Sequence, residues 1–311
     1  MAMTPDLSVI VPLFNEEESV GPLYRAIVDA LDPLGLSYEM IFVDDGSRDG
    51  SFPAAKRFAE GDMRLRVVRF RKNYGQTPAM AAGIEHAMGR VLVTMDGDLQ
   101  NDPADIPQFL KKIDEGYDIV CGWRHKRQDK LISRKIPSVI ANWIIGRITG
   151  VPIKDNGCSL KAYRAGIIKS IPLYSDMHRF IPAMTSMAGT TVAQLKVNHS
   201  ARRFGVSKYG ISRIYKVIID LLVIKTLLTF QSKPMHLFAV GGLMSMGLGG
   251  ALLVLALKDL LTNGGVDLMF ASGGLLFLIL AFYLPLVGFL CELVNKTGDF
   301  RALAHLKETV E

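Results

Sequence analysis

The sequence predicts an α/β protein, in which a mainly parallel sheet flanked by helices is followed by interfacial helices and two transmembrane helices. In residues 1–125, short β-branched apolar runs alternate with helical patterns, as they do in parallel sheets that helices cover. Met235–Leu257 and Leu268–Leu290 carry no formal charge, and at about 1.5 Å per residue each can cross the ~30 Å core of a bilayer. With 49% hydrophobic and 21% charged residues among 311, the composition excludes a disordered or fibrous chain.

The strands of the predicted sheet are apolar runs rich in valine, isoleucine and leucine, bounded by turn residues. Five fall in the alternating region, and a sixth precedes a basic segment. They are expected at Leu7–Pro12, Glu39–Val43, Leu65–Phe70, Val91–Met95, Asp118–Gly122 and Val192–Asn198.

The first helix is expected over Ser19–Leu31, because Asn15 offers a side-chain cap and acidic residues after it suit the exposed amides of a first turn. Asp102 and Pro103 open another helix in the same way. Three later segments also have helical patterns, and the last mixes basic and apolar residues as an interfacial helix does: Ser133–Thr149, Ala165–Pro172 and Ile211–Phe230.

The chain is basic, with a formal net charge of +6, which would suit nucleic acid, anionic lipid or a phosphorylated substrate. Basic residues cluster at Arg124–Lys135 and Arg202–Lys208 without an aromatic stripe or a nucleic-acid-binding motif, so no nucleic-acid partner is expected. The three cysteines and six histidines show no metal-ligand spacing, and neither a disulfide framework nor a zinc site is predicted.

The most informative motif is Asp96-Gly97-Asp98, which directly follows an apolar strand. In an open α/β sheet the carboxyl ends of the strands form the ligand crevice. Two carboxylates at that edge suit Mg²⁺ or Mn²⁺ bridged to a diphosphate. An acidic turn without a ligand is the alternative for this motif taken alone.

A second acidic pair, Asp44 and Asp45, ends another predicted strand. Two such pairs at neighbouring strand ends concentrate negative charge, which a cation or hydrogen-bond donors must compensate, and a ribose diol or a base edge supplies such donors. Helix capping is the alternative for this pair, since Gly46 and Ser47 are also turn residues. No glycine-rich dinucleotide motif or P-loop occurs, so those routes to phosphate binding have no support.

Taken together, four segments resemble the inverting family 2 glycosyltransferases, which have a GT-A (Rossmann-like) fold: Leu7–Glu16, Val43–Ser47, Arg71–Gln76 and Asp96–Gln100. Three later segments, followed by the two apolar spans, are similar to polyprenyl-phosphate glycosyltransferases: Asp155–Arg164, Arg179–Pro182 and Arg202–Tyr209. That group includes dolichol-phosphate mannose synthases, bactoprenol glucosyltransferases and undecaprenyl-phosphate 4-deoxy-4-formamido-L-arabinose transferases. The arabinose-type enzymes resemble the chain most, and the resemblance covers residues 5–300.

The resemblance implies a role for each residue that matches a family motif. The nucleotide-sugar donor would contact Pro12, Asn15, Glu16, Asp44, Gln76, Asp96 and Gln100. The metal, Mg²⁺ or Mn²⁺, would be held by Asp96 and Asp98. The catalytic group would comprise Asp96, Asp98, Asp155, Arg124 and Arg134. Orienting the acceptor or the sugar is the role expected of Asp155, and spacing alone does not fix that role. The acceptor phosphate would lie beside Arg124, Arg134, Arg203 and Lys208.

The charges of the two substrates lead to the same role for the basic residues. A nucleotide diphosphate and a lipid phosphate repel strongly in a dry site unless cations lie between them. Arginine offers phosphate a bidentate fork and lysine a point charge. For Lys126, Arg127 and Lys130, a loop that faces solvent or lipid headgroups is the favoured interpretation.

The expected organisation is a cytoplasmic GT-A catalytic domain (1–210), an interfacial amphipathic region (211–234), a transmembrane helix (235–257), a short extracytoplasmic loop (258–267), a second transmembrane helix (268–291) and a cytoplasmic tail (292–311). Basic residues flank the spans on the side of the large domain, so the positive-inside rule predicts a multi-pass inner-membrane protein with both termini in the cytoplasm. Small residues of the first span, among them Gly241, Ser245 and Gly249, suit close helix packing within the chain or between subunits, and a homo-oligomer is expected.

The predicted reaction is therefore inverting, metal-dependent transfer of a single sugar from a nucleotide-diphosphate sugar, expected to be a UDP-sugar, to undecaprenyl phosphate. A phosphate monoester is largely a nucleophilic anion at neutral pH, so positioning and charge neutralisation dominate over general-base chemistry. A processive polysaccharide synthase is the alternative, but it would have a Gln-x-x-Arg-Trp motif and more spans. A catalytically silent, membrane-anchored nucleotide-sugar binder is disfavoured by the intact acidic set.

Overall fold

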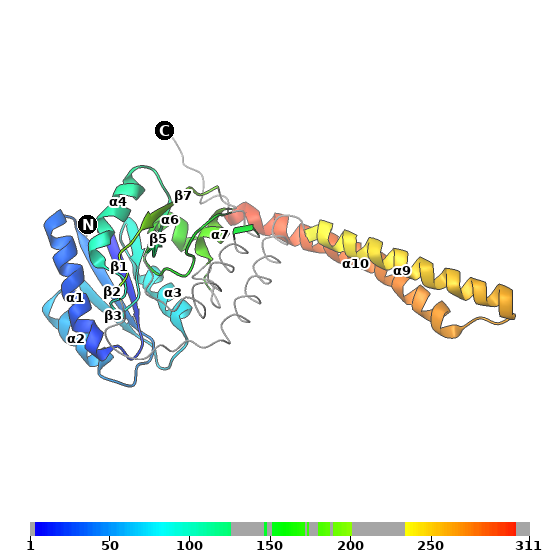
Figure 1. Ribbon diagram of the computed structural model, residues 1–311, viewed down its shortest axis with the longest axis horizontal. Coiled ribbons are helices and arrows are strands. Elements are labelled where there is room, and N and C mark those ends of the chain that lie inside the picture. The colour runs from blue at the N-terminus through cyan, green and yellow to red at the C-terminus, as the bar shows by residue number, and fades with distance from the viewer. Residues whose placement is uncertain are drawn as a thin grey trace. The chain divides into compact units, whose positions relative to one another are not determined.

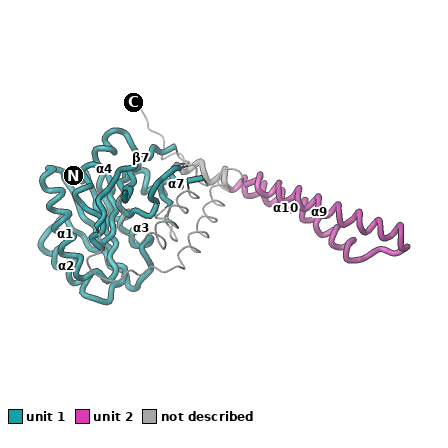
Figure 2. The backbone as a smooth tube through the Cα atoms, in the orientation of Figure 1, with its two compact units in different colours: residues 1–221 teal, residues 222–311 magenta. Residues whose placement is uncertain are grey.

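The computed structural model describes residues 4–125, 146–147, 151–171, 173, 180–186, 189–200 and 234–302 of the chain. The chain divides into two compact units, residues 1–221 and 222–311 (Figure 2). The predicted helix over Ser133–Thr149 lies almost wholly outside the described residues, and the interfacial segment 211–233 lies outside them altogether, so both stay predictions.

A sheet flanked by helices runs through the described part of the first unit (Figure 1). It has seven strands in the order β3-β2-β1-β4-β6-β5-β7. Strands β1, β2, β3 and β4 are parallel to one another, and β5 is parallel to β7, whereas β6 runs antiparallel between β4 and β5. The predicted mainly parallel sheet is confirmed. The strands are β1 (Leu7–Leu13), β2 (Tyr38–Asp44), β3 (Leu65–Arg69), β4 (Val91–Thr94), β5 (Ile119–Trp123), β6 (Lys161–Arg164) and β7 (Val192–Lys196).

Helices cover both faces of this sheet, and the alternation of side chains along β1 shows why. Val9 and Val11 enter one hydrophobic cluster, whereas Ile10 enters another on the opposite face. Because both faces are buried, the central strands are nearly continuous apolar runs in the sequence. The first cluster includes side chains of α1 (Glu17–Leu31), α2 (Ser51–Gly61) and α4 (Ile106–Asp114), and the second those of α3 (Gln76–His86), α6 (Ala165–Lys169) and α7 (Ile181–Ser186).

The six predicted strands all form, with ends that differ from the prediction by one or two residues. Strand β6 was not predicted, because its four residues carry Lys161 at one end and Arg164 at the other and show no apolar run. Lys161 is nonetheless buried, and it pairs with Thr94 of β4 and with Cys121 of β5. The antiparallel β6 thus begins at the edge of the sheet where its parallel neighbours end.

The prediction that Asn15 caps the first helix was wrong. Helix α1 begins at Glu17, and the residue at its cap position, Glu16, makes no side-chain cap hydrogen bond. Asn15 instead has a φ of 52° and accepts a hydrogen bond from the Arg48 backbone N–H at 2.9 Å, so its amide serves a neighbouring loop. The predicted cap at Asp102 is confirmed, since its side chain accepts from the Ala104 N–H at 3.0 Å at the start of a short 3₁₀ helix, η2 (Pro103–Asp105), that leads into α4.

The helix predicted over Ala165–Pro172 is shorter than expected, because α6 ends at Lys169. A second short 3₁₀ helix, η1 (Asp32–Leu34), follows α1 and turns the chain toward β2.

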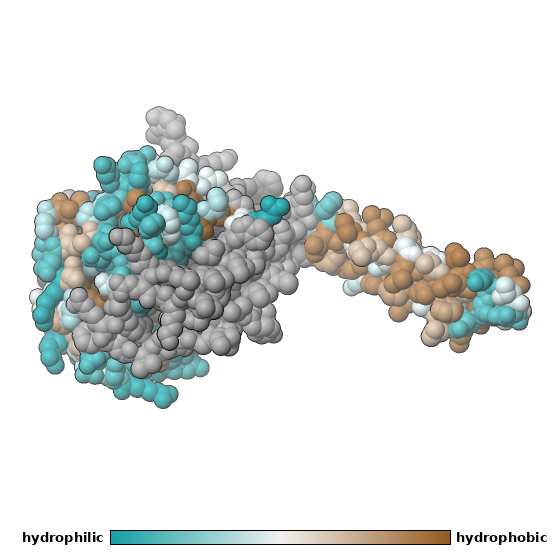
Figure 3. Space-filling view, in the orientation of Figure 1, coloured by the Kyte–Doolittle hydropathy of each residue, from teal (hydrophilic) through white to brown (hydrophobic). Residues whose placement is uncertain are grey.

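The second unit contains two long helices, α9 (Pro234–Asn263) and α10 (Leu268–Ala302). Both α9 and the 268–294 part of α10 are long and apolar enough to cross a membrane, and most of their side chains are exposed, unlike those of a core helix. Figure 3 shows apolar side chains over much of the visible surface of these helices, with polar ones at the turn between them.

Close packing of α9 against α10 depends on small residues. A Cβ on Gly242 would lie 2.9 Å from the Ala281 carbonyl oxygen, and one on Gly249 would lie 3.0 Å from that of Gly274. Small residues of the first span therefore let the two helices approach each other within one chain. The homo-oligomer stays a prediction.

Candidate active site

The acidic residues singled out in the sequence lie at the carboxyl edge of the parallel strands. Asp44 ends β2 and is in register with Leu13 at the end of β1, and Asp96 follows β4, the strand on the other side of β1. The three strands are hydrogen-bonded neighbours, so their ends share one edge of the sheet. This is the edge at which open α/β sheets bind ligands.

Asp44 and Asp45 are both buried but have different surroundings. Asp45 accepts from the backbone N–H groups of Tyr74 and Gly75 at 2.7 and 2.8 Å, and burial, with the nearby charge of Asp44, raises its pKa. Asp44 accepts from the Ser47 N–H at 3.3 Å through Oδ1. Its Oδ2 is buried without a hydrogen-bond partner among the described residues, although Arg69 Nε lies 3.6 Å away. Asp45 therefore holds a loop, whereas Asp44 retains capacity for a donor group from a ligand.

Hydrogen bonds join the residues just after β1 to the segment that follows β2. The backbone N–H groups of Asn15 and Glu16 donate to the hydroxyls of Ser47 and Ser51 at 2.9 and 2.7 Å. The Glu16 carboxylate also accepts from the Ser19 hydroxyl at 3.1 Å. These bonds bring the predicted donor-binding residues of β1 and β2 together in one place.

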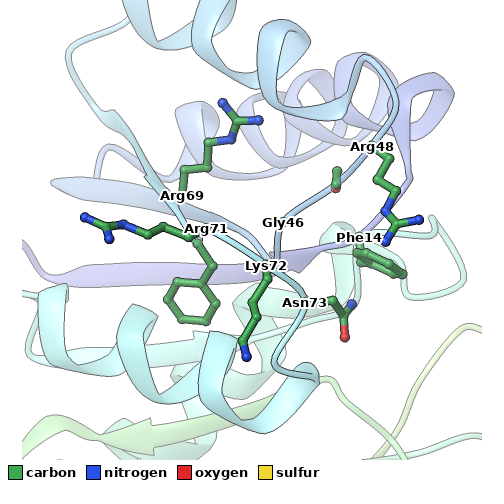
Figure 4. A pocket seen from close by; sticks show the side chains of 9 residues that line it. Phe14, Gly46, Arg48, Arg69, Arg71, Lys72 and Asn73 are labelled. Atoms are coloured by element: carbon green, nitrogen blue, oxygen red, sulfur yellow. The ribbon is translucent and has the colours of Figure 1, made fainter.

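A cavity of about 560 Å³ lies beside this junction (Figure 4). It combines aromatic rings with four cationic side chains, a lining that suits the base and phosphate of a nucleotide. Gly46 has a φ of 67°, and a Cβ there would lie 2.5 Å from the backbone carbon of Lys72, so only glycine lets the two loops meet at its wall. The lining residues are Phe14, Gly46, Ser47, Arg48, Arg69, Phe70, Arg71, Lys72 and Asn73.

The Asp96–Asp98 turn packs against the end of β1. A Cβ on Gly97 would lie 2.6 Å from a methyl carbon of Leu13 and 3.1 Å from the carbonyl oxygen of Pro12, so the turn needs glycine in order to approach the strand. Asp96 is partly exposed and accepts a hydrogen bond from Gln76 Nε2 at 2.6 Å. Asp98 is buried, and its Oδ1 accepts from the backbone N–H of Gln100 at 3.2 Å. Leu99, between Asp98 and Gln100, has a φ of 60°, so the backbone of this turn is strained.

Arg124 and Asp155 form a nearly buried ion pair where β5 ends. Nε and Nη2 of the guanidinium donate to the two carboxylate oxygens at 2.7 and 2.9 Å. Burial alone would lower the pKa of Arg124, but the hydrogen bonds and charge of Asp155, with a smaller contribution from Asp96, raise it above its ordinary value. The guanidinium therefore stays charged and lies within the field of the acidic turn.

The turn that contains Gln100 is also joined to the end of β7. Asn101 forms an isolated β-bridge with His199, and the Ser200 N–H donates to the Gln100 carbonyl at 3.0 Å. Nearby, the buried Asp105 accepts from the backbone and side-chain N–H groups of Asn198 at 2.7 and 3.1 Å. The chain that leads toward Arg203 and Lys208 thus starts against the acidic turn.

The structure brings together ten of the sequence-predicted site residues at this edge, whereas three cationic ones lie outside the described residues. The ten are Pro12, Asn15, Glu16, Asp44, Gln76, Asp96, Asp98, Gln100, Arg124 and Asp155, and the three are Arg134, Arg203 and Lys208. The cavity residues Phe14, Arg48, Arg69 and Phe70 had no predicted role. Their signal was the mixture of aromatic and basic residues at or just after the ends of β1, β2 and β3, at the same edge as the acidic pairs.

Comparison with known proteins identifies the family of the chain. Residues 8–171 match the family described as glycosyl transferase family 2. A dodecaprenyl-phosphate galacturonate synthase of Rhizobium johnstonii is 43% identical over 302 residues, which cover 94% of this chain and 88% of the relative. Undecaprenyl-phosphate 4-deoxy-4-formamido-L-arabinose transferases of Shewanella sediminis and Salmonella typhimurium are 34% and 35% identical, covering 95% of this chain and 89% and 90% of theirs. Identity to the galacturonate synthase thus exceeds that to the arabinose-type enzymes, which the sequence resemblance put first.

Solved structures agree on the fold. Glucosyl-3-phosphoglycerate synthase of Mycobacterium tuberculosis, solved with uridine diphosphate, has a TM-score of 0.56 and 20% identity, covering 71% of this chain and 80% of that one. The same enzyme with Mn²⁺ and UDP-glucose gives 0.55 and 18%, covering 71% and 79%. At this identity the likeness extends to the GT-A-like fold alone, as the sequence predicted.

Proposed function

The chain belongs to glycosyl transferase family 2, and from this we propose that it transfers a single sugar from a nucleotide-diphosphate donor to a polyprenyl phosphate at the cytoplasmic face of the inner membrane. The polyprenyl phosphate is inferred from relatives that cover nearly the whole chain and whose names specify such an acceptor. The two apolar helices would keep the enzyme in the bilayer that holds this acceptor.

The binding of a nucleotide-sugar donor is inferred from one segment, residues 72–76, which connects the cavity with the Asp96–Asp98 turn. Lys72 and Asn73 line the cavity, and Gln76, three residues further on, donates to Asp96. A nucleotide with its base in the cavity would therefore direct its diphosphate toward Asp96. The buried Oδ2 of Asp44 would accept a hydrogen bond from the base or the ribose. We propose a UDP-sugar as the donor.

The Asp96–Asp98 turn fits a divalent cation in its chemistry, because hard carboxylate oxygens at a strand end are the ligands that Mg²⁺ and Mn²⁺ prefer. In the described part of the chain no group of three His, Cys, Asp or Glu side chains could hold a metal ion. Asp96 and Asp98 are the residues that would hold it. The ion would supply positive charge to the departing nucleoside diphosphate.

The cationic residues then act on the acceptor. Arg124 is held in one orientation by Asp155, and we propose that Asp155 fixes the guanidinium so that its charge faces the space between donor and acceptor phosphates. Arg134, Arg203 and Lys208, which lie outside the described residues, are proposed to complete this cationic set. The acceptor phosphate is already an anion at neutral pH, so these residues position it for a single displacement, which inverts the anomeric carbon.

The test is a donor and acceptor panel with the purified full chain in nanodiscs. UDP- and GDP-sugars, UDP-galacturonate among them, are each incubated with undecaprenyl phosphate, and the lipid product is identified by mass spectrometry. One sugar attached to the lipid phosphate is expected from a UDP-sugar. A polymer would indicate a processive synthase, and nucleotide-sugar binding without a lipid product would indicate a silent binder; either result would overturn the proposal.

A further inference from the structure

The second feature of the carboxyl edge is a cationic cluster around Trp123, at the end of β5. Lys154 Nζ lies 4.2 Å and Lys196 Nζ 5.7 Å from the centroid of the indole ring. The His125 ring packs edge-on against the indole, with centroids 4.9 Å apart. Both lysines and the histidine are exposed, and Trp123 is half-buried. We call these four residues the Trp123 patch.

The backbone holds the Trp123 patch in shape. The Lys154 N–H donates to the Gln194 side-chain oxygen at 2.8 Å, and the Gln194 side-chain nitrogen donates to the Pro152 carbonyl at 3.0 Å. The Val197 N–H donates to the Trp123 carbonyl at 3.1 Å. Lys154 lies on a loop and Lys196 at the end of β7, and hydrogen bonds join that loop to β7. The backbone of both lysines is therefore held beside the indole.

The patch carries charge of one sign. The segments that build it, residues 119–125, 151–154 and 189–200, contain no aspartate or glutamate. The next acidic residue along the chain, Asp155, is buried and engaged with Arg124. These segments therefore contribute basic but no acidic side chains to the surface around the indole, which favours the approach of an anion.

The topology sets the patch apart from the donor cavity. The cavity lies at the ends of β1, β2 and β3, which form one end of the strand order, whereas β5 and β7 form the other end. Because β5 and β7 are parallel neighbours, their carboxyl ends lie side by side. Basic sequence follows β5 directly and follows β7 after a few residues. Residues 126–135 hold five Lys and Arg against one Asp, and residues 201–216 hold five without an acidic residue.

We propose that the Trp123 patch is a contact surface for the anionic phospholipid headgroups of the bilayer. An indole is most stable at a membrane interface, where its ring lies among apolar groups and its N–H meets water. Lysines whose ammonium groups lie close to the ring attract anionic headgroups, and long lysine side chains can keep their apolar stems against an apolar surface while the charge stays in water. The contact would hold the acceptor side of the sheet, next to Arg124, against the surface that presents the lipid phosphate.

The proposal shares with the proposed function the premise that the chain is held at a bilayer, and its test needs no turnover. The full chain contains two tryptophans, Trp123 and Trp143. The Trp143→Phe protein is reconstituted into vesicles of phosphatidylcholine and phosphatidylglycerol whose acyl chains carry bromine near the headgroup. Bromine quenches tryptophan fluorescence at short range, so the emission reports whether Trp123 touches the lipid.

We expect Trp123 to be quenched in vesicles with phosphatidylglycerol, and less so in pure phosphatidylcholine or in high salt. Adding Lys154→Gln and Lys196→Gln should abolish most of the quenching, whereas the matched pair Lys56→Gln and Lys111→Gln, on α2 and α4, should leave it unchanged. If Trp143→Phe does not fold, the difference in quenching between the unsubstituted chain and Trp123→Phe measures the same contact.

Unquenched Trp123 in anionic vesicles, or quenching that survives the loss of both patch lysines, would overturn the proposal. Quenching in a protein that makes no lipid product would support the surface while contradicting the proposed function, so the two failures are distinguishable.

Discussion

The Arg124 guanidinium binds the Asp155 carboxylate at two points, and the Arg124 backbone N–H donates to the same carboxylate at 3.3 Å. Three donors on one buried carboxylate connect the end of β5 with the loop before β6. Removing one member leaves a largely buried charge without its partner, which costs more than breaking an exposed pair of the same geometry.

Asp155→Ala is therefore expected to lower the free energy of unfolding by about 3–5 kcal/mol, measured by denaturant titration of the full chain in detergent. The matched control is Asp114→Ala, which breaks the exposed ion pair between Arg90 and Asp114 and should cost under about 1 kcal/mol. Equal effects of the two substitutions would mean that the Arg124–Asp155 pair is hydrated in solution.

Asp98→Ala is expected to abolish sugar transfer and to leave the fold intact, because a metal held by two carboxylates loses half of its protein ligands. Asp96→Ala should also be severe. Excess chelator should inactivate the unsubstituted enzyme, and Mg²⁺ or Mn²⁺ should restore it. Asp102→Ala, which removes only the cap of η2, should retain transfer. Near-normal activity of Asp98→Ala, or full activity in chelator, would argue against the metal site.

Gly46→Ala should destabilise the protein far more than Gly35→Ala. Both glycines have positive φ, at 67° and 64°, so each alanine brings a similar backbone cost of about 1–2 kcal/mol. A Cβ on Gly35 meets nothing within 4 Å, whereas one on Gly46 meets the Lys72 backbone at 2.5 Å. Thermal melting of both variants, with nucleotide titration calorimetry, tests this; equal melting temperatures would show that the cavity wall can move.

The buried Asp105 and the partly buried Asp62 should show opposite pH dependence. Burial raises the pKa of Asp105 above 3.8, so its contribution to stability is present below that pH and is lost as the pH rises through the folded-state pKa. Arg64 hydrogen bonds lower the pKa of Asp62 to about 2, so its contribution is present above pH 3.8 and is lost as the pH falls toward 2.

The melting temperature of Asp105→Asn, relative to that of the unsubstituted protein, should therefore be highest near neutral pH. This difference should shrink as the pH falls toward 3.8. Asp62→Asn should be destabilised near neutral pH and lose that deficit in acid. Melting temperatures between about pH 2 and 7 measure both effects, and parallel pH curves for the two variants would contradict the assignment.

Arg203→Gln and Lys208→Gln are expected to impair use of the acceptor by roughly ten- to a hundredfold, the size of a lost charge-assisted hydrogen bond. Donor binding should change little. Calorimetric titration of the nucleotide sugar, paired with kinetics in which polyprenyl phosphate is varied, separates the two effects. A collapse of donor binding with a normal acceptor dependence would move this segment to the nucleotide side of the site.

The sheet and its acidic edge were predictable because they depend on local patterns. Strands buried on both faces must be apolar runs, and Asp44 and Asp96 follow such runs directly, so topology alone brings them to one edge. Two later apolar stretches likewise identify the helices α9 and α10 by length and composition. The amino-acid sequence by itself therefore determined the fold class, the position of the acidic residues and the family resemblance.

Which partner each side chain has was decided only by the tertiary structure. Asn15 resembles a helix cap locally, yet the approach of the Arg48 loop offers its amide a different N–H. Strand β6 is short and polar at both ends, and it is a strand because it pairs with β4 on one side and β5 on the other. This pairing buries Lys161. Hydrogen bonds and ion pairs between segments far apart in the chain depend on distances that no local pattern encodes, and for that reason the Arg124–Asp155 pair could be established only from the folded chain.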